Sequence, residues 1–153
     1  MIIEEKLIKL GIELFDPPAP LANYISINQA GDLLFVAGTG PVSNSEIDYK
    51  GILGKELTIE QGYEAAKLTA INIISILKKH LGDLDRVKKI LKVTGFVASA
   101  NDFYDQPAVI NGASDLFVAV FGDEGKHARA ALGTSVLPFN MSVEIMAIVQ
   151  IHE

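Results

Sequence analysis

The chain contains no cysteine, and this absence excludes three kinds of chemistry. Without a thiol it can form no disulfide, no thiolate nucleophile and no cysteine-ligated zinc site. Long apolar runs are also missing, since none approaches about 20 residues, the length that a helix needs to span a bilayer. The N-terminal segment lacks the basic region and long apolar stretch of a secretory leader. We therefore expect a soluble, cytoplasmic protein with no membrane partner.

Basic residues are few: 13 lysines and arginines stand against 19 acidic residues, which gives a formal net charge of -6. An acidic chain is repelled by phosphate backbones, so we do not expect a nucleic-acid partner. His80, His127 and His152 lack the spacing of metal ligands, and no metal site is expected. Ser114 and Ser135 have no visible arrangement of histidine and carboxylate, which argues against a serine nucleophile.

Hydrophobic residues make up 49% of the sequence, enough to fill the core of one domain over residues 1–153. Residues 1–19 are expected to form a short amphipathic helix and an extended lead-in, because consecutive prolines cannot continue a helix. Apolar patterns predict strands at residues 23–29, 33–37, 87–98, 127–134 and 142–151. The strand at residues 33–37 is apolar throughout, so we expect it to be covered on both faces.

Two longer helices are predicted between these strands. Thr58 and Gln61 form a capping box that opens a helix running to about His80. The second helix is expected from about Gln106 to Phe121. Two helices packed on one face of a single sheet give a two-layer α+β domain. The opposite face has too many apolar residues for contact with water, so we expect self-association through the sheet.

Arg129 is one of only two arginines, and it lies in an apolar run. A guanidinium with space in front of it suits a planar carboxylate, because two parallel N–H bonds reach both oxygens. A second apolar run, residues 143–149, carries the lone carboxylate Glu144. Two interpretations stay open: Arg129 binds a carboxylic acid, or it pairs with Glu144 or reaches water. A tight hairpin turning near residues 136–137 would bring the two together, and a glutamate beside an arginine should stay ionised.

Several segments in a fixed order resemble one known family. They are Leu33 to Gly38, Asn111 within Val109 to Phe117, Ala128-Arg129-Ala130-Ala131, Leu137-Pro138 and Val143-Glu144-Ile145. This order and spacing resemble a divergent branch, of about 150 residues, of the Rid (YjgF-like, L-PSP endoribonuclease-like) family. The resemblance covers most of residues 20–153. It implies a chorismate-mutase-like α+β fold with a mixed sheet, and a homotrimer with a central barrel and ligand clefts between subunits.

The same resemblance implies a chemistry. Rid proteins hydrolyse reactive enamines or imines of amino acids to 2-keto acids and ammonia, and this hydrolase activity needs no cofactor. By resemblance, Arg129 would hold the carboxylate of a small metabolite and Glu144 would orient or activate water. The further substrate contacts would come from Tyr24, Gly38, Thr39 and Asn111. Each of these four also has an ordinary structural explanation, such as strand packing for Tyr24 or loop capping for Thr39.

Two departures from the family pattern bear on catalysis. Ala37 stands where well-studied members have a serine, and Ala131 stands where they often have a cysteine. Carboxylate binding would survive these losses better than catalysis, so a non-catalytic trimer that binds small carboxylates is the alternative. The older ribonuclease label is disfavoured by the acidic charge and by the lack of a histidine pair.

Overall fold

The computed structural model describes residues 2–153 and contains one five-stranded sheet of order β1-β2-β7-β5-β6. In that order its strands are β1 (Ile27–Ala30), β2 (Leu33–Thr39), β7 (Val143–Ile151), β5 (Val87–Ala98) and β6 (Ala128–Thr134). The helices are α1 (Ile2–Lys9), α2 (Ile59–Leu81) and α3 (Gln106–Phe121). Short strands β3 (Val42–Ser43) and β4 (Glu46–Ile47) form a small hairpin. Three short 3-10 turns complete the set: η1 (Leu84–Arg86), η2 (Gly122–Gly125) and η3 (Pro138–Asn140).

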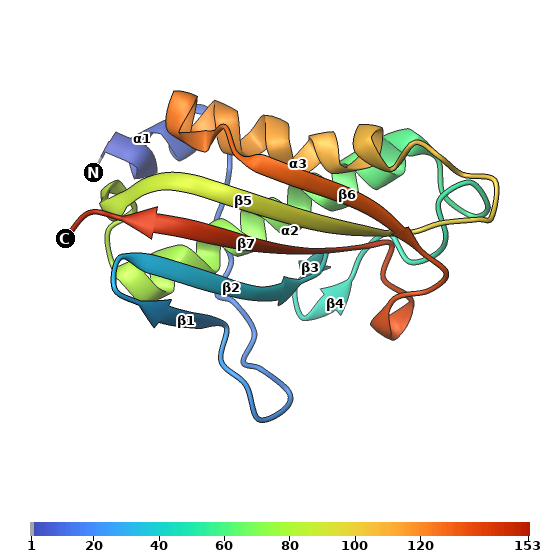
Figure 1. Ribbon diagram of the computed structural model, residues 1–153, viewed down its shortest axis with the longest axis horizontal. Helices are drawn as coiled ribbons and strands as arrows, with labels where there is room; N and C mark the ends of the chain where they lie inside the picture. The colour runs from blue at the N-terminus through green and yellow to red at the C-terminus, as the bar shows by residue number, and fades with distance from the viewer. Residues whose placement is uncertain (1) are drawn as a thin grey trace.

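Helices α2 and α3 pack side by side against one face of the sheet, as Figure 1 shows. Most strand pairs are antiparallel, whereas β5 and β6 are parallel because α3 carries the chain back between them. The predicted two-layer α+β architecture, with a mixed sheet and two main helices on one face, is therefore confirmed. Among residues 2–153, no helix combines the length and apolar character needed to cross a membrane.

The last two strands do not form the hairpin that would have brought Arg129 and Glu144 together. β6 and β7 are not neighbours, because β5 lies between them and pairs with both. The local apolar pattern predicts each strand but not the long-range pairing that inserts β5. As a consequence, the sequence separation of Arg129 and Glu144 says nothing about their distance in space.

The sheet has one buried face and one open face. Along β7 every second residue from Val143 to Ile151 is buried toward the helices, and the side chains between them face the other way. On the open face Phe35 is 43% exposed in β2, so the prediction that residues 33–37 are covered on both faces is wrong for a single chain. Exposed large apolar side chains also include Leu132 and Met146.

Helix α2 begins and ends where its sequence predicts. The Thr58 hydroxyl accepts the Gln61 backbone N–H at 3.3 Å, and the Gln61 side chain accepts the Thr58 N–H at 2.9 Å. Gly82 ends the helix with a positive φ of 78°. The predicted apolar stripe is buried: Ala66, Ala70, Ile73, Ile74 and Leu77. The first strand, by contrast, begins at Ile27 rather than residue 23, because the preceding residues 21–25 are exposed.

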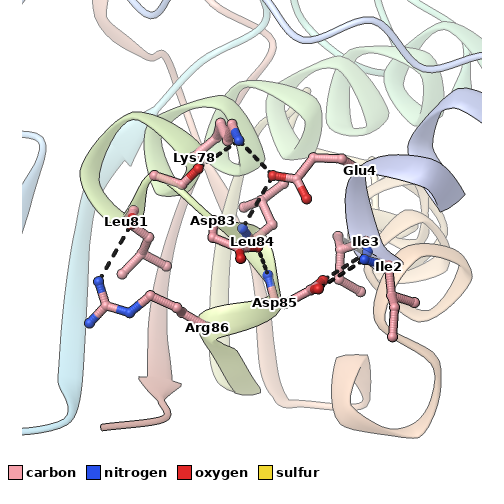
Figure 2. Close-up of polar contacts among 10 residues, drawn as sticks. Ile2, Ile3, Glu4, Lys78, Leu81, Asp83, Leu84, Asp85 and Arg86 are labelled. Carbon is pink, nitrogen blue, oxygen red and sulfur yellow. Dashed lines mark hydrogen bonds and ion pairs between the residues drawn. The ribbon is translucent and has the colours of Figure 1, made fainter.

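Polar contacts hold α1 to the C-terminal end of α2 and to η1 (Figure 2). Asp85 accepts the backbone N–H groups of Ile2 at 2.8 Å and Ile3 at 2.9 Å, so its carboxylate caps α1. Glu4 accepts a hydrogen bond from Lys78 Nζ at 2.6 Å. Burial raises the pKa of Glu4, but hydrogen bonds from Lys78 and from backbone N–H groups outweigh it and leave the pKa below its usual value.

Candidate functional site

Arg129 lies on the edge strand β6 and points toward the helix layer. It is paired in register with Val93 of β5, which is buried beneath the helices. Arg129 Nη1 donates to Asn111 Oδ1 at 2.7 Å and to Ser114 Oγ at 3.2 Å. Asn111 and Ser114 are three residues apart on α3, so they lie on one face of that helix, next to each other. The fold thus brings Arg129 together with Asn111, although they are 18 residues apart in sequence.

These two bonds leave one edge of the guanidinium without a protein partner. Each Nη nitrogen carries two hydrogens, and Nη1 uses both of its own on Asn111 and Ser114. Within residues 2–153 no hydrogen bond or ion pair of Nη2 or Nε is found. The Nε–Nη2 edge is one of the two positions from which arginine binds a carboxylate through parallel hydrogen bonds. Arg129 is exposed, so a ligand from solution can approach this edge.

The sequence did not predict the contact between Ser114 and His127. Ser114 Oγ lies 2.8 Å from His127 Nε2, and His127 Nδ1 lies 2.7 Å from the carbonyl oxygen of Gly125. Burial, together with the nearby charge of Arg129, lowers the pKa of His127 even though the Gly125 contact favours the charged form. The sequence held a signal, since His127 precedes Arg129 by two residues, just before β6, and Ser114 follows Asn111 by three residues on α3. No carboxylate supports the imidazole, as the Gly125 carbonyl occupies that position.

Glu144 lies on the opposite face of the sheet from Arg129. It is half-buried on β7, opposite Phe96 in register, between the buried residues Val143 and Ile145. An ion pair with Arg129 of the same chain is therefore ruled out. The expected lowering of its pKa by a nearby arginine is also absent: burial raises the pKa of Glu144.

Gly38 lies directly against Glu144. A Cβ atom at Gly38 would come within 2.9 Å of Glu144 Oε1, so only glycine permits this approach without a shift of the glutamate. The neighbouring Thr39 hydroxyl donates to the Ala37 carbonyl at 2.9 Å. This is the expected local capping bond, so the hydroxyl hydrogen is not free for a ligand. Tyr24 is 54% exposed in the loop before β1. Gly38 and Glu144 thus form a second group, separate from Arg129 and Asn111 within one chain.

One hollow and one cluster of carboxylates lie away from both Arg129 and Glu144. The hollow has a volume of about 450 Å³ and is lined by the proline-rich segment 17–20, residues 25–27 and the end of α2. Glu4, Asp83 and Asp85 have carboxylate oxygens within 4.8 Å of one another, a spacing that could hold a cation. These side chains already serve the fold, because Glu4 Oε1 binds Lys78 and both aspartates accept backbone N–H groups. This cluster is better explained by the docking of α1 than by a metal ion.

Comparison with known proteins now adds to this geometry. A family model described as "YjgF/chorismate_mutase-like, putative endoribonuclease" matches residues 4–151. Protein TCP17 of Trypanosoma cruzi is 42% identical over 151 residues, 98% of this chain and 94% of that protein. The crystal structure of protein Atu1372 from Agrobacterium tumefaciens, of unknown function, is 43% identical with a TM-score of 0.93, over 99% of this chain and 93% of that one. The YjgF gene product of E. coli, 20% identical, has a TM-score of 0.64 over 88% of this chain and 93% of its own, and supports the fold alone. As its sequence predicted, the chain belongs to the YjgF/Rid family and has the chorismate-mutase-like fold.

Proposed function

We propose that the protein hydrolyses reactive enamine or imine intermediates of amino acids to 2-keto acids and ammonia. Family membership supports this reaction class, and one observation carries the proposal for this chain. Arg129 is held by Asn111 and Ser114 with its Nε–Nη2 edge free, in an exposed position. Every imine derived from a 2-amino acid has a carboxylate next to the reacting carbon, so this edge supplies a contact common to all such substrates.

A homotrimer with clefts between subunits fits the distribution of the two groups. Arg129 and Glu144 project from opposite faces of the sheet, so one chain cannot place both against one substrate. The open face carries Phe35, Leu132 and Met146 in exposed positions, and large apolar side chains exposed on one sheet face are typical of an interface. In a closed trimer, the Arg129 group of one protomer would face the Glu144 group of the next.

The chemistry requires little beyond positioning. Water attacks the carbon of the protonated imine while Glu144 takes one water proton, which gives a carbinolamine. Glu144 returns this proton to the nitrogen, and the C–N bond breaks as the hydroxyl forms the C=O bond of the 2-keto acid. The hydroxyl proton leaves with the departing ammonia as ammonium. Burial raises the pKa of Glu144 toward neutral pH, so its carboxylate is a stronger base than that of an ordinary glutamate. Holding the substrate carboxylate on Arg129 would fix the imine carbon relative to the water.

A coupled assay tests the proposal directly. A dehydratase generates 2-aminoacrylate from serine, and the decay of this intermediate is followed with and without the protein. We expect acceleration by the wild type and a loss of roughly a hundredfold or more in kcat/KM for Arg129→Ala, since two charged hydrogen bonds disappear. Arg86→Ala is a matched control, because Arg86 is the other arginine and its side chain makes a long 3.4 Å contact with the Leu81 carbonyl, away from Arg129. No acceleration by the wild type, where a known Rid protein is active, rejects the proposal.

A second candidate is a trimer that binds small carboxylates without turnover. The observation that favours it is the loss of two side chains: Ala37 and Ala131 have no hydroxyl or thiol, and the Thr39 hydroxyl is occupied by the Ala37 carbonyl. Calorimetry with 2-ketobutyrate separates the candidates when read beside the coupled assay. Saturable binding that disappears in Arg129→Ala, without any acceleration of 2-aminoacrylate decay, favours the binding protein.

A further inference from the structure

A chain of three hydrogen bonds runs from the backbone of η2 to the guanidinium of Arg129. It starts at the Gly125 carbonyl, passes through both ring nitrogens of His127 and the Ser114 hydroxyl, and ends at Arg129 Nη1. We propose that Ser114 and His127 are positioning residues that fix Arg129 so that its Nε–Nη2 edge faces the substrate carboxylate. This inference rests on the proposed function of Arg129 and adds two residues to its site.

The donors and acceptors along this series of hydrogen bonds are consistent with a neutral His127 that carries its hydrogen on Nδ1. A carbonyl oxygen can only accept, so His127 Nδ1 carries the hydrogen that Gly125 accepts at 2.7 Å. In the neutral imidazole, Nε2 is then an acceptor, and the Ser114 hydroxyl donates to it at 2.8 Å. The Ser114 oxygen keeps lone pairs for the N–H of Arg129 Nη1. Burial and the charge of Arg129 lower the pKa of His127, which favours this neutral form.

The end of this hydrogen-bond chain at Gly125 and His127 is tightly packed. Gly125 is buried, and any Cβ there would overlap the Phe117 carbonyl, so its backbone is packed tightly on α3. The His127 ring also makes an edge contact with the Phe117 ring, with centroids 5.9 Å apart and an angle of 86° between planes. Phe117 is fully buried. The imidazole is therefore fixed by a backbone carbonyl and by a core aromatic ring.

Fixing Arg129 matters because the side chain is long and exposed. An unrestrained arginine loses rotamer freedom when it grips a ligand, and that loss weakens binding. Asn111 alone restrains one hydrogen of Nη1, which leaves rotation about that contact. The second bond, to Ser114, defines the plane of the guanidinium and so the direction of its free edge. Removal of Ser114 or His127 should thus loosen Arg129 without changing its charge.

Side-chain NMR tests the positioning role without any substrate. The chain has only two arginines, so isotopically labelled arginine gives two Nε–H signals, with Arg86 as an internal reference. We expect Arg129 to be ordered in the wild type, and its order parameter to fall below about 0.6 in Ser114→Ala. Ser135→Ala, the same change at an exposed serine outside the chain of bonds, should leave Arg129 unchanged. Ser114→Thr keeps the hydroxyl and should restore the order.

His127→Phe supplies an independent variant, since it keeps a ring against Phe117 and removes both nitrogens. We expect it to loosen Arg129 as Ser114→Ala does. An Arg129 signal that is as ordered in both variants as in the wild type overturns the inference, as does an Arg129 that is already mobile in the wild type.

Affinity for 2-ketobutyrate gives the functional readout. We expect the dissociation constant to rise about tenfold in Ser114→Ala, the loss of one hydrogen bond to a charged group, and to stay unchanged in Ser135→Ala. In the coupled assay the change should appear in KM, with kcat largely kept. Wild-type protein that binds no carboxylate would refute the proposed function, and the order of Arg129 would still decide the positioning role. Carboxylate binding that is insensitive to Ser114→Ala refutes the positioning role alone.

Discussion

Mixed trimers of two inactive variants test whether each catalytic site is shared between protomers. Arg129→Ala removes the proposed carboxylate contact, and Glu144→Ala removes the group proposed to orient water. Because the two side chains project from opposite faces of the sheet, each site would take Arg129 from one protomer and Glu144 from the next. A trimer that combines both variants then contains one interface at which both side chains are present.

The expected activity follows from counting these interfaces. In a closed ring of three, every mixed arrangement has one intact site of three. Random assembly at equal concentrations makes about three quarters of the trimers mixed, so the pool should recover about one quarter of the wild-type activity. If both residues acted within one chain, no mixed trimer would hold an intact site, and the recovery would be absent.

The assay is co-refolding of the two variants, followed by 2-aminoacrylate decay. Each variant alone should stay inactive, which excludes residual activity as the source of the recovery. A double variant mixed with wild type gives a second check: shared sites predict about one quarter of the activity, and unshared sites about one half. Absence of recovery from a pool that native mass spectrometry shows to contain mixed trimers would refute the shared site.

Three further predictions concern stability and pH. Thr58→Ala should lower the free energy of unfolding by about 1 kcal/mol in denaturant titration, because the capping box of α2 is lost. Gly112→Ala should cost about 3 kcal/mol or prevent folding, measured in the same titration, because a Cβ there would overlap the Tyr63 carbonyl and force α2 and α3 apart. The raised pKa of Glu144 means that the folded state binds its proton more tightly, so stability should fall as pH rises from 4.5 through the raised pKa. Glu144→Gln should remove this fall, which melting curves across that pH range would detect.

Local sequence patterns predicted the elements of this fold better than their arrangement. The capping box at Thr58 and the glycine at residue 82 set both ends of α2, because those interactions are made within one or two turns of chain. The insertion of β5 between β6 and β7 was not predicted, since strand order depends on pairing between distant segments. The exposure of Phe35 was missed for a related reason, because an apolar side chain gives no sign of whether its cover comes from its own chain or from another.

The same contrast between local pattern and long-range arrangement holds for the candidate site. Arg129 was recognisable in the sequence because a charged residue is unusual in an apolar run. Its match to the arginine of the family supported the choice. Its contacts with Asn111 and Ser114 required the packing of β6 on α3, which no spacing reveals. The role of Ser114 has no sequence pattern of its own, whereas a serine nucleophile is expected with a histidine supported by a carboxylate. The structure instead places a backbone carbonyl behind His127.

The separation of Arg129 and Glu144 has a physical advantage for a site that binds an organic acid. If both lay on one face of one chain, within a few ångströms, each would neutralise the other and the guanidinium edge would be occupied. Placement on opposite faces keeps the edge of Arg129 free and leaves Glu144 in a partly buried position that raises its pKa. We infer that assembly, and not the folding of the single chain, brings the cation and the base to the same substrate. In the proposed trimer the substrate carboxylate would bind the guanidinium in place of Glu144, and Glu144 would stay available to the water.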